Sequence, residues 1–324
     1  MQPIIISHEH PDWFKPLFLE LENRKIPFKT INPTEHFFAL NSPKLDFSVF
    51  FNRMSPSAYL RDGIQGTFYT QNYLSFLEYH GVRVINGSKS YSYETSKALQ
   101  LLLLQKLGIK YPKSRVVNHL SQIIPAAKGL RFPIVVKANI GGSGAGIEKF
   151  DSESEIREAI KNNNIDFGID HTALVQEFIP ARGGCIHRVE TLAGNYLYAI
   201  KVYTNGESFN LCPADICQTT SGVELLRNAC ALDAPKNGLK VEGFTPSPSI
   251  IELVETIVRH CQLDVGGIEY IIDDRDGDVL YYDINALSNF VADAVNVIGF
   301  NPHSRLVDFL EEQIEIQMGE KIES

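Results

Sequence analysis

Residues 135–147 read VVKANIGGSGAGI, an apolar run that ends in Lys137 and leads into a glycine-rich loop. Glycine has no Cβ, so the backbone N–H groups of such a loop can turn toward an anion, and the lysine adds a positive charge. The stretch therefore predicts a flap that covers phosphates, with a flexible hairpin loop as the alternative. The flap residues are Gly141, Gly142, Ser143, Gly144, Ala145 and Gly146.

Two common phosphate-binding motifs do not fit this loop. In a P-loop, GxxxxGK[ST], the lysine follows the glycines, whereas Lys137 precedes them. In a dinucleotide fingerprint, GxGxxG, Gly142 and Gly144 would require a glycine at position 147, where the chain has Ile147. The loop is therefore neither of these two nucleotide motifs.

A second informative stretch lies nearer the C-terminus, where residues 266–285 read GGIEYIIDDRDGDVLYYDIN. The turn residues centre near position 276, which predicts a hairpin with Glu269 opposite Asp283, to within one residue. Asp283 and Asn285 are two residues apart and share a face of their strand. Facing carboxylates repel one another unless a cation or a proton lies between them, and hard oxygen ligands suit Mg²⁺. The pattern predicts a magnesium site; the alternative is that the acids face solvent.

A third stretch, residues 176–180, reads QEFIP. A strand that ends in this way can offer backbone groups to the edge of an adenine and an apolar side chain to its face. We expect adenine to contact Gln176, Glu177, Phe178 and Ile179. An ordinary strand end is the alternative.

Outward from these motifs, the chain divides into three parts. Strand-like and helical segments alternate over residues 1–90, which predicts a small parallel α/β layer. A helix and a module with the glycine loop follow over 91–185, and hairpins with helices, including a last amphipathic helix, over 186–324. In the first part we expect strands at 3–7, 26–31, 45–51 and 82–85 and helices at 12–24 and 68–80. In the rest we expect helices at 94–107 and 249–261 and hairpins at 186–217 and 266–285.

Composition excludes several classes of protein. The chain has 324 residues, of which 44% are apolar and 21% charged, and its net charge is −9. These values are typical of an ordered globular protein and argue against a broad nucleic-acid-binding surface. The longest apolar run, Leu101–Leu104, is far too short to span a membrane, and the N-terminal residues lack the pattern of a signal peptide. Five scattered cysteines indicate reduced thiols, so we expect a cytoplasmic protein.

The order of these motifs carries a resemblance. Lys97 on a helix, Lys137 before a glycine flap, the 176–179 stretch, Arg188 and a final acid followed by Asp-x-Asn resemble the ATP-grasp superfamily. The similarity is greatest to RimK-type carboxylate–amine (glutamate) ligases and covers about residues 90–300. It implies an α/β (α+β) fold, in which a parallel α/β domain precedes the ATP-grasp domain.

The resemblance also implies a role for individual residues. Lys97 and Lys137 would contact the phosphates of ATP, together with Asn210. Arg188 would face the acyl phosphate and Lys201 would join it. Two Mg²⁺ ions, with Mn²⁺ as an alternative, would be held by Glu269, Asp283 and Asn285.

The chain departs from the family pattern at three points. Ile186 stands where relatives have an acid that holds the ribose, so that contact would need another group. Thr95-Ser96-Lys97 lacks the aspartate that often precedes the lysine. The two metal acids occur as Glu269 and then Asp283, where Asp and then Glu is the commoner order; the charge is preserved.

By resemblance, the reaction joins a carboxylate to an amine through an acyl phosphate and releases ADP and phosphate. The partners would be a small-molecule or peptide carboxylate and an amine, with no nucleic acid and no membrane, and a homodimer is expected from base rates. A kinase that stops at phosphoryl transfer and an ATP-binding regulatory protein without turnover are the alternatives.

Two further residues have open interpretations. Arg53 follows a predicted strand of the first layer, where ligands bind in open α/β sheets, and would hold a substrate carboxylate or form a surface salt bridge. His187 is interpreted as an ordinary strand histidine rather than a catalytic group.

Overall fold

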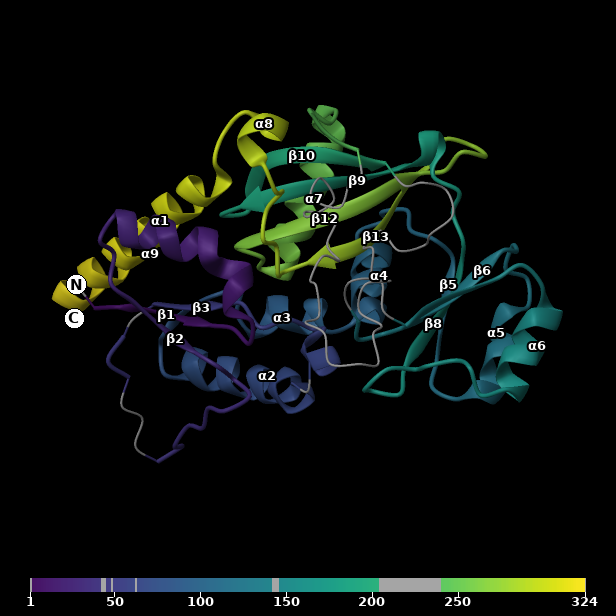
Figure 1. Cartoon of the computed structure of the whole chain (residues 1–324), viewed down its shortest axis with the longest axis horizontal. Helices are drawn as coiled ribbons and strands as arrows, with labels where there is room; N and C mark the ends of the chain where they lie inside the picture. Colours follow the sequence, from purple (N-terminus) through teal and green to yellow (C-terminus); the bar gives the residue numbers. More distant parts are fainter. Residues whose placement is uncertain are drawn as a thin grey trace.

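The computed structural model describes residues 2–41, 45–47, 49–61, 63–141, 146–203 and 240–323. Within these ranges the chain forms three β-sheets with helices packed on their faces (Figure 1). One sheet is parallel and two are antiparallel, so the predicted mixed α/β class is confirmed. The strand-like residues 204–217, which include the end of the hairpin predicted at 186–217, lie outside the described residues.

The N-terminal sheet is parallel, as predicted, and has the order β2-β1-β3-β4. Alternate side chains of its strands enter two different cores. Ile4 and Ile6 pack with α1, whereas Ile5 packs with α2 on the opposite face. The strands are β1 (Ile4–Ser7), β2 (Phe28–Ile31), β3 (Val49–Asn52) and β4 (Arg83–Ile85). The helices are α1 (Lys15–Asn23), α2 (Ile64–Tyr79) and α3 (Ser88–Glu94).

The middle sheet is antiparallel with the order β5-β8-β6-β7, and α5 and α6 cover one of its faces. Its strands are β5 (Ser114–Val117), β6 (Ile134–Ala138), β7 (Ile147–Phe150) and β8 (Ala173–Glu177). The two helices are α5 (Ile123–Ala127) and α6 (Glu153–Lys161). Ser152 Oγ accepts a hydrogen bond from Glu155 N (3.3 Å) and caps α6.

The C-terminal sheet is antiparallel with the order β11-β10-β9-β12-β13. Helices α4 and α7 pack on one face, and α9 packs near the other face beside α1 (Figure 1). The strands are β9 (Cys185–Leu192), β10 (Asn195–Tyr203), β11 (Val241–Phe244), β12 (Val265–Ile272) and β13 (Val279–Asn285). The helices are α4 (Lys97–Lys106), α7 (Pro248–Cys261), α8 (Ala294–Ile298) and α9 (Pro302–Glu323). Single 3₁₀ turns occur at Pro11–Phe14, Ala58–Arg61, Leu120–Gln122 and Arg182–Gly184.

A buried asparagine fastens the parallel sheet to the C-terminal sheet. Asn86 has a left-handed backbone (φ 53°) and is fully buried. Its side-chain amide donates to Val265 O (2.7 Å) and Ala286 O (2.6 Å), and its Oδ1 accepts from Val265 N (3.0 Å). The nearby Arg83–Asp264 ion pair (2.5 Å) spans the same junction. These contacts fix the position of the β12–β13 hairpin relative to the parallel sheet.

Each of the three sheets is built from one continuous stretch of the chain. The parallel sheet uses residues 4–85, the middle sheet 114–177 and the C-terminal sheet 185–285. We therefore propose to keep 1–90, 91–185 and 186–324 as the three structural units. Among the described helices, none combines the length and the apolar character needed to span a membrane.

Candidate active site

An ion pair joins the start of α4 to β13. Lys97 Nζ lies 2.7 Å from Asp283 Oδ1, and both side chains are only partly exposed, by 14% and 20%. Ser96 caps the helix, because its Oγ accepts from Leu99 N (3.2 Å). The structure thus brings together the predicted phosphate-binding lysine and one predicted metal ligand.

Gln100 holds α4 against the same strand. Its Oε1 accepts from Ile284 N (3.1 Å), and its Nε2 donates to Ile284 O (2.9 Å). Because Lys97 and Gln100 are three residues apart, they lie on the same side of the helix. Gln100 therefore fixes the backbone beside Asp283 while Lys97 contacts its carboxylate.

The predicted register of the β12–β13 hairpin is confirmed, since Glu269 pairs directly with Asp283. Glu269 is buried and fully bonded: its Oε1 accepts from Arg188 Nη1 (2.8 Å) and its Oε2 from the Tyr282 hydroxyl (2.7 Å). Arg188 also contacts Glu190, with 2.5 Å between Nε and Oε1. The guanidinium is therefore held between two buried carboxylates.

Gly267 makes room for this arginine. A Cβ at position 267 would lie 2.8 Å from Arg188 Nε and 2.8 Å from Glu190 Oε1, closer than real Cβ contacts. The GG pair before Glu269 is thus explained in part by the packing of Arg188, which lies on the neighbouring strand β9 of the same sheet.

Lys137 enters the same region from β6. The strand end docks on the start of α4, because Lys97 N donates to Asn139 O (3.2 Å) and Ala98 N donates to Asn139 Oδ1 (2.9 Å). Burial, together with the neighbouring Lys97 charge, lowers the pKa of Lys137 to about 7, against the attraction of Asp283 and Glu269. The glycine-loop strand and the acid hairpin therefore share one electrostatic environment.

Charges in this group shift one another's protonation. Burial works against the charged forms of Lys97 and Asp283, but their mutual attraction outweighs it, so the pKa of Lys97 is raised and that of Asp283 is lowered. Burial raises the pKa of Glu269 despite the Arg188 charge. Burial also raises the pKa of Glu94 to about 7, although the carboxylate accepts a hydrogen bond from Ala286 N.

Two of the three predicted magnesium ligands, Asp283 and Asn285, keep an oxygen without a hydrogen-bond partner among the described residues, whereas both oxygens of Glu269 are engaged. Among the described residues, Asp283 Oδ2 and Asn285 Oδ1 have no hydrogen-bond partner, while Asn285 Nδ2 faces Gly267 O at 3.5 Å. The part of the chain that the structure describes holds no cluster of three or more His, Cys, Asp or Glu side chains at metal-binding spacing. The third predicted donor is an amide oxygen, and carboxylate and amide oxygens are ligands that Mg²⁺ accepts.

The predicted adenine stretch is partly used by the protein itself. Gln176 Nε2 donates to Ser114 Oγ (2.6 Å), and Glu177 Oε1 accepts from Arg131 N (2.9 Å). Ile179 is buried, and Lys149 Nζ lies 5.3 Å from the centre of the Phe178 ring. The side chains of Gln176 and Glu177 therefore stabilise the sheet, and the backbone N–H groups of Glu177 and Phe178 also donate within the protein, to Lys113 O (2.9 Å) and Pro133 O (3.0 Å).

The two ends of the predicted flap lie near the end of β6. Gly141 is buried, and Gly146 has φ +69° and accepts a hydrogen bond from Ala138 N (3.1 Å). The remaining flap residues and one predicted phosphate contact lie outside the described residues: Gly142, Ser143, Gly144, Ala145 and Asn210.

The structure does not bring Lys201 to Arg188. Arg188 pairs with Ile200 across β9 and β10, so Lys201 lies opposite His187 and faces the other side of the sheet. There Lys201 Nζ lies 5.2 Å from the Phe244 ring centre. His187 is buried and stacks on Tyr270 at 4.6 Å, and burial lowers its pKa to about 4, as expected for a strand histidine.

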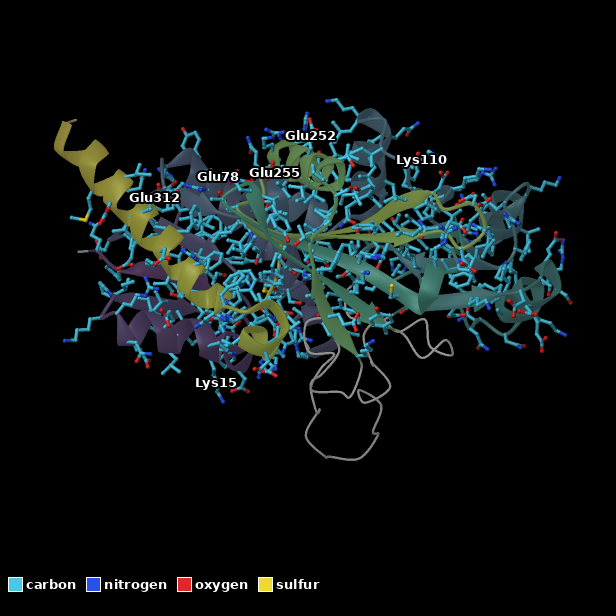
Figure 2. The ribbon with its side chains drawn as sticks, turned by 90° about the horizontal axis from the view of Figure 1, so that it is seen from above. Lys15, Glu78, Lys110, Glu252, Glu255 and Glu312 are labelled. Atoms are coloured by element: carbon cyan, nitrogen blue, oxygen red, sulfur yellow. The ribbon has the colours of Figure 1, made fainter. Side chains whose placement is uncertain are left out.

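Several residues of this region were missed in the sequence. The buried acids Glu94 and Glu190 resemble ordinary surface charges, and Gln100 is hidden in a leucine-rich helix. One signal for Glu190 was available in the sequence. It lies two residues from Arg188, and residues two apart in a strand share a face of the sheet. By contrast, charged residues labelled in Figure 2, such as Lys110, Glu252 and Glu312, lie at the periphery.

Comparison with known proteins shows which proteins the chain is similar to. Residues 94–211 match the RimK-like ATP-grasp domain. The carbamoyl phosphate synthase large chain of Thermotoga petrophila is 27% identical over 165 residues, which are 47% of this chain and 14% of that protein. The coenzyme gamma-F420-2:alpha-L-glutamate ligase of Methanocaldococcus jannaschii is 27% identical over 158 residues, 47% of this chain and 53% of that protein. The chain thus spans less than two thirds of either relative.

Among solved structures, the ATP-grasp ligase PsnB, complexed with a phosphomimetic variant of its minimal precursor, Mg and ADP, is similar along the whole chain. The TM-score is 0.67 at 15% identity, over 97% of this chain and 99% of that chain. The fold is therefore that of ATP-grasp proteins. Together with the domain match over residues 94–211, this confirms the predicted resemblance to the ATP-grasp superfamily and its RimK-like domain.

Proposed function

We propose that this chain is an ATP-dependent carboxylate–amine ligase. The observation that carries the proposal is the convergence of Lys97, Lys137 and Arg188 on Asp283 and Glu269. Lys137, Arg188 and Glu269 are buried, while Lys97 and Asp283 keep partial contact with solvent. Such a group of charges suits a nucleoside triphosphate that enters from the side of Lys97 and Asp283.

The proposed reaction has two steps. An oxygen of the substrate carboxylate attacks the γ-phosphorus of ATP, the bond to the bridging oxygen breaks, and ADP leaves. The amine nitrogen then attacks the acyl carbon, the bond to the phosphate oxygen breaks, and the amine loses a proton. Such chemistry needs positioning and charge neutralisation more than proton transfer, which fits a site built from lysines and an arginine.

Magnesium would be held by Glu269, Asp283 and Asn285, with two ions as the expected number. Bound Mg²⁺ would neutralise phosphate oxygens and orient them for transfer. Adenine would contact backbone groups of residues 176–179, and the residues of the glycine flap would cover the phosphates. Because Ile186 has an apolar side chain, a group other than this residue would have to contact the ribose.

We propose the substrates by chemical class: one is a small-molecule or peptide carboxylate and the other is an amine. The structurally similar ligase PsnB was solved with a precursor peptide, which favours including peptides in any screen. The described thiols Cys185 and Cys261 are free and buried, which fits the reducing cytoplasm. A homodimer stays a prediction.

The test is Mg²⁺-dependent release of ADP with a panel of carboxylates and amines, with hydroxylamine added to trap an acyl phosphate. A ligase gives ADP and a hydroxamate, and both disappear when EDTA is added. ADP without hydroxamate from any carboxylate would instead indicate a kinase, and no ADP under any condition would indicate an ATP-binding regulatory protein.

A further inference from the structure

Arg53 is buried without an acidic partner. It follows β3 directly and is 2% exposed. Its Nη2 donates to Ser288 O and to Asn289 Oδ1 (2.8 Å), whereas its Nε and Nη1 have no hydrogen-bond partner. None of the described carboxylates forms an ion pair with it. A buried guanidinium of this kind is costly, because it has given up water and no described carboxylate contacts it directly.

His8 adds a second unpartnered group beside it. His8 follows β1 directly, is 6% exposed, and neither of its ring nitrogens has a hydrogen-bond partner among the described residues. The neighbouring strands pair Ser7 with Asn52, so His8 and Arg53 are next to each other on one face of the sheet. Both contact Phe14: its ring centre lies 5.3 Å from that of His8 and 5.1 Å from Arg53 Cζ.

The guanidinium is held in place before any ligand binds. Phe14 and Phe51 each lie 5.1 Å from Arg53 Cζ, and the two acceptors on Nη2 fix its orientation. Those acceptors belong to the segment that follows the metal-ligand strand β13. Glu94 and Glu190 are the acids whose charges act on Arg53, and Glu94 accepts from Ala286 N at the end of that strand. Arg53 therefore lies beside the proposed active site but outside its metal donors.

We propose that Arg53 and His8 form a binding site for a carboxylate that the substrate keeps, distinct from the carboxylate that is phosphorylated. This inference rests on the proposed ligase function and adds a specificity determinant to it. The remaining N–H groups of Arg53 and one ring N–H of His8 supply the donors.

The charge of the site selects the ligand. Burial and the Arg53 charge both disfavour protonation of His8, so the pair carries one positive charge. The other nearby titratable groups are accounted for within the protein: burial lowers the pKa of His303 to about 4, Glu9 is paired with Arg61 (2.6 Å) and Glu190 with Arg188 (2.5 Å), and burial raises the pKa of Glu94 to about 7. One positive charge matches a single carboxylate better than a phosphate dianion.

The experiment compares each substrate with its carboxamide. In one arm the carboxylate of the amine substrate is replaced by a carboxamide; in the other, the non-reacting carboxylate of the acyl substrate is replaced. In one of these two arms, the one whose carboxylate binds Arg53, we expect the wild type to prefer the carboxylate over the carboxamide by about 100-fold in kcat/KM. This is the size expected when a charged group is lost from a buried site. In Arg53→Gln this preference should fall below about 10-fold through KM, with turnover of the carboxamide unchanged.

Two further variants control for folding. Arg53→Lys keeps the charge without the planar fork and should retain part of the preference. Arg83→Gln breaks another arginine contact between the same two sheets and should leave the preference unchanged. An unchanged preference in Arg53→Gln, or an equal loss in Arg83→Gln, would overturn the inference.

A readout without turnover separates this inference from the proposed function. Amino acids and dicarboxylates should raise the melting temperature of the wild type more than their carboxamides do, and Arg53→Gln should abolish the difference. If the wild type never releases ADP but shows this difference, the ligase function fails and the carboxylate site stands. If ADP is released and carboxylates stabilise both proteins equally, the carboxylate site fails alone.

Discussion

Lys97 Nζ lies 2.7 Å from Asp283 Oδ1, although the two residues are 186 positions apart. A second lysine–aspartate pair of nearly the same length, Lys110 Nζ to Asp278 Oδ1 at 2.6 Å, joins the chain just after α4 to the turn of the same hairpin. The second pair is 63% and 44% exposed, whereas the first is 14% and 20% exposed. The two pairs therefore offer a matched comparison of a site contact with a surface contact.

Asp283→Ala should abolish ADP release and leave the protein folded, because it removes a proposed metal ligand and the partner of Lys97. Asp278→Ala should leave activity unchanged and cost less than about 1 kcal/mol, as is usual for an exposed ion pair. Steady-state kinetics and urea unfolding measure both effects. Normal turnover in Asp283→Ala would remove the metal assignment.

Lys137→Met should weaken ADP and ATP binding by roughly tenfold or more, because a charge next to the phosphates is lost. The same change should stabilise the ligand-free protein at pH 7. The folded pKa of about 7 lies below the usual 10.5, so the unfolded chain binds more protons and wild-type stability rises with pH between these values. Calorimetry should also show proton uptake when nucleotide binds to the wild type at pH 8.

Lys113→Met is the control for Lys137→Met, since the Lys113 side chain is 75% exposed on the same middle sheet unit. It should change neither nucleotide affinity nor stability measurably. A Lys137→Met protein that melts lower than the wild type at pH 7 and binds ADP equally well would contradict the proposed role of this lysine.

The hairpin register could be predicted from the sequence because the turn residues and the alternating strands leave little freedom. The start of α2 could not: the helix was expected at 68 and begins at Ile64, since Gly63 and Gly66 resemble helix breakers. A Cβ at Gly66 would lie 2.8 Å from Met54 Cε, so this glycine serves close packing within a helix. The packing of Gly66 against Met54 therefore outweighs the low helix propensity of glycine.

Site residues that meet across long sequence separations were harder to assign to one another. The resemblance implies that Lys201, on the next strand, joins Arg188. The register of β9 and β10 contains an irregularity between Tyr196 and Tyr198 and puts Lys201 on the other face. A shift of one residue reverses the face of every side chain, and the sequence does not specify such a shift.

Gly267→Ala should lower activity strongly, because the added Cβ would displace the Arg188 guanidinium from Glu190 and Glu269. The stability cost should be about 1–3 kcal/mol, as for overpacking in a tight interior. Gly319→Ala is the matched control: nothing lies within 4 Å of its Cβ position in α9, and alanine should stabilise the helix by up to about 1 kcal/mol. Kinetics and thermal unfolding distinguish the two; wild-type activity in Gly267→Ala would show that Arg188 need not be held in this position.

Glu94→Gln should stabilise the protein at pH 8 and leave it nearly unchanged at pH 5. Burial raises the folded pKa of Glu94 to about 7 from a usual value of 4.5. Between these values the folded state binds the extra proton, so wild-type stability falls as pH rises from about 4.5 to 7. Glutamine keeps an oxygen that can accept from Ala286 N but carries no charge to bury, so the gain at pH 8 should be on the order of 1–3 kcal/mol. Thermal unfolding at both pH values measures it. An equal effect of the substitution at pH 5 and pH 8 would mean that Glu94 does not bury a charge, and that its contact with Ala286 alone accounts for its place beside the site.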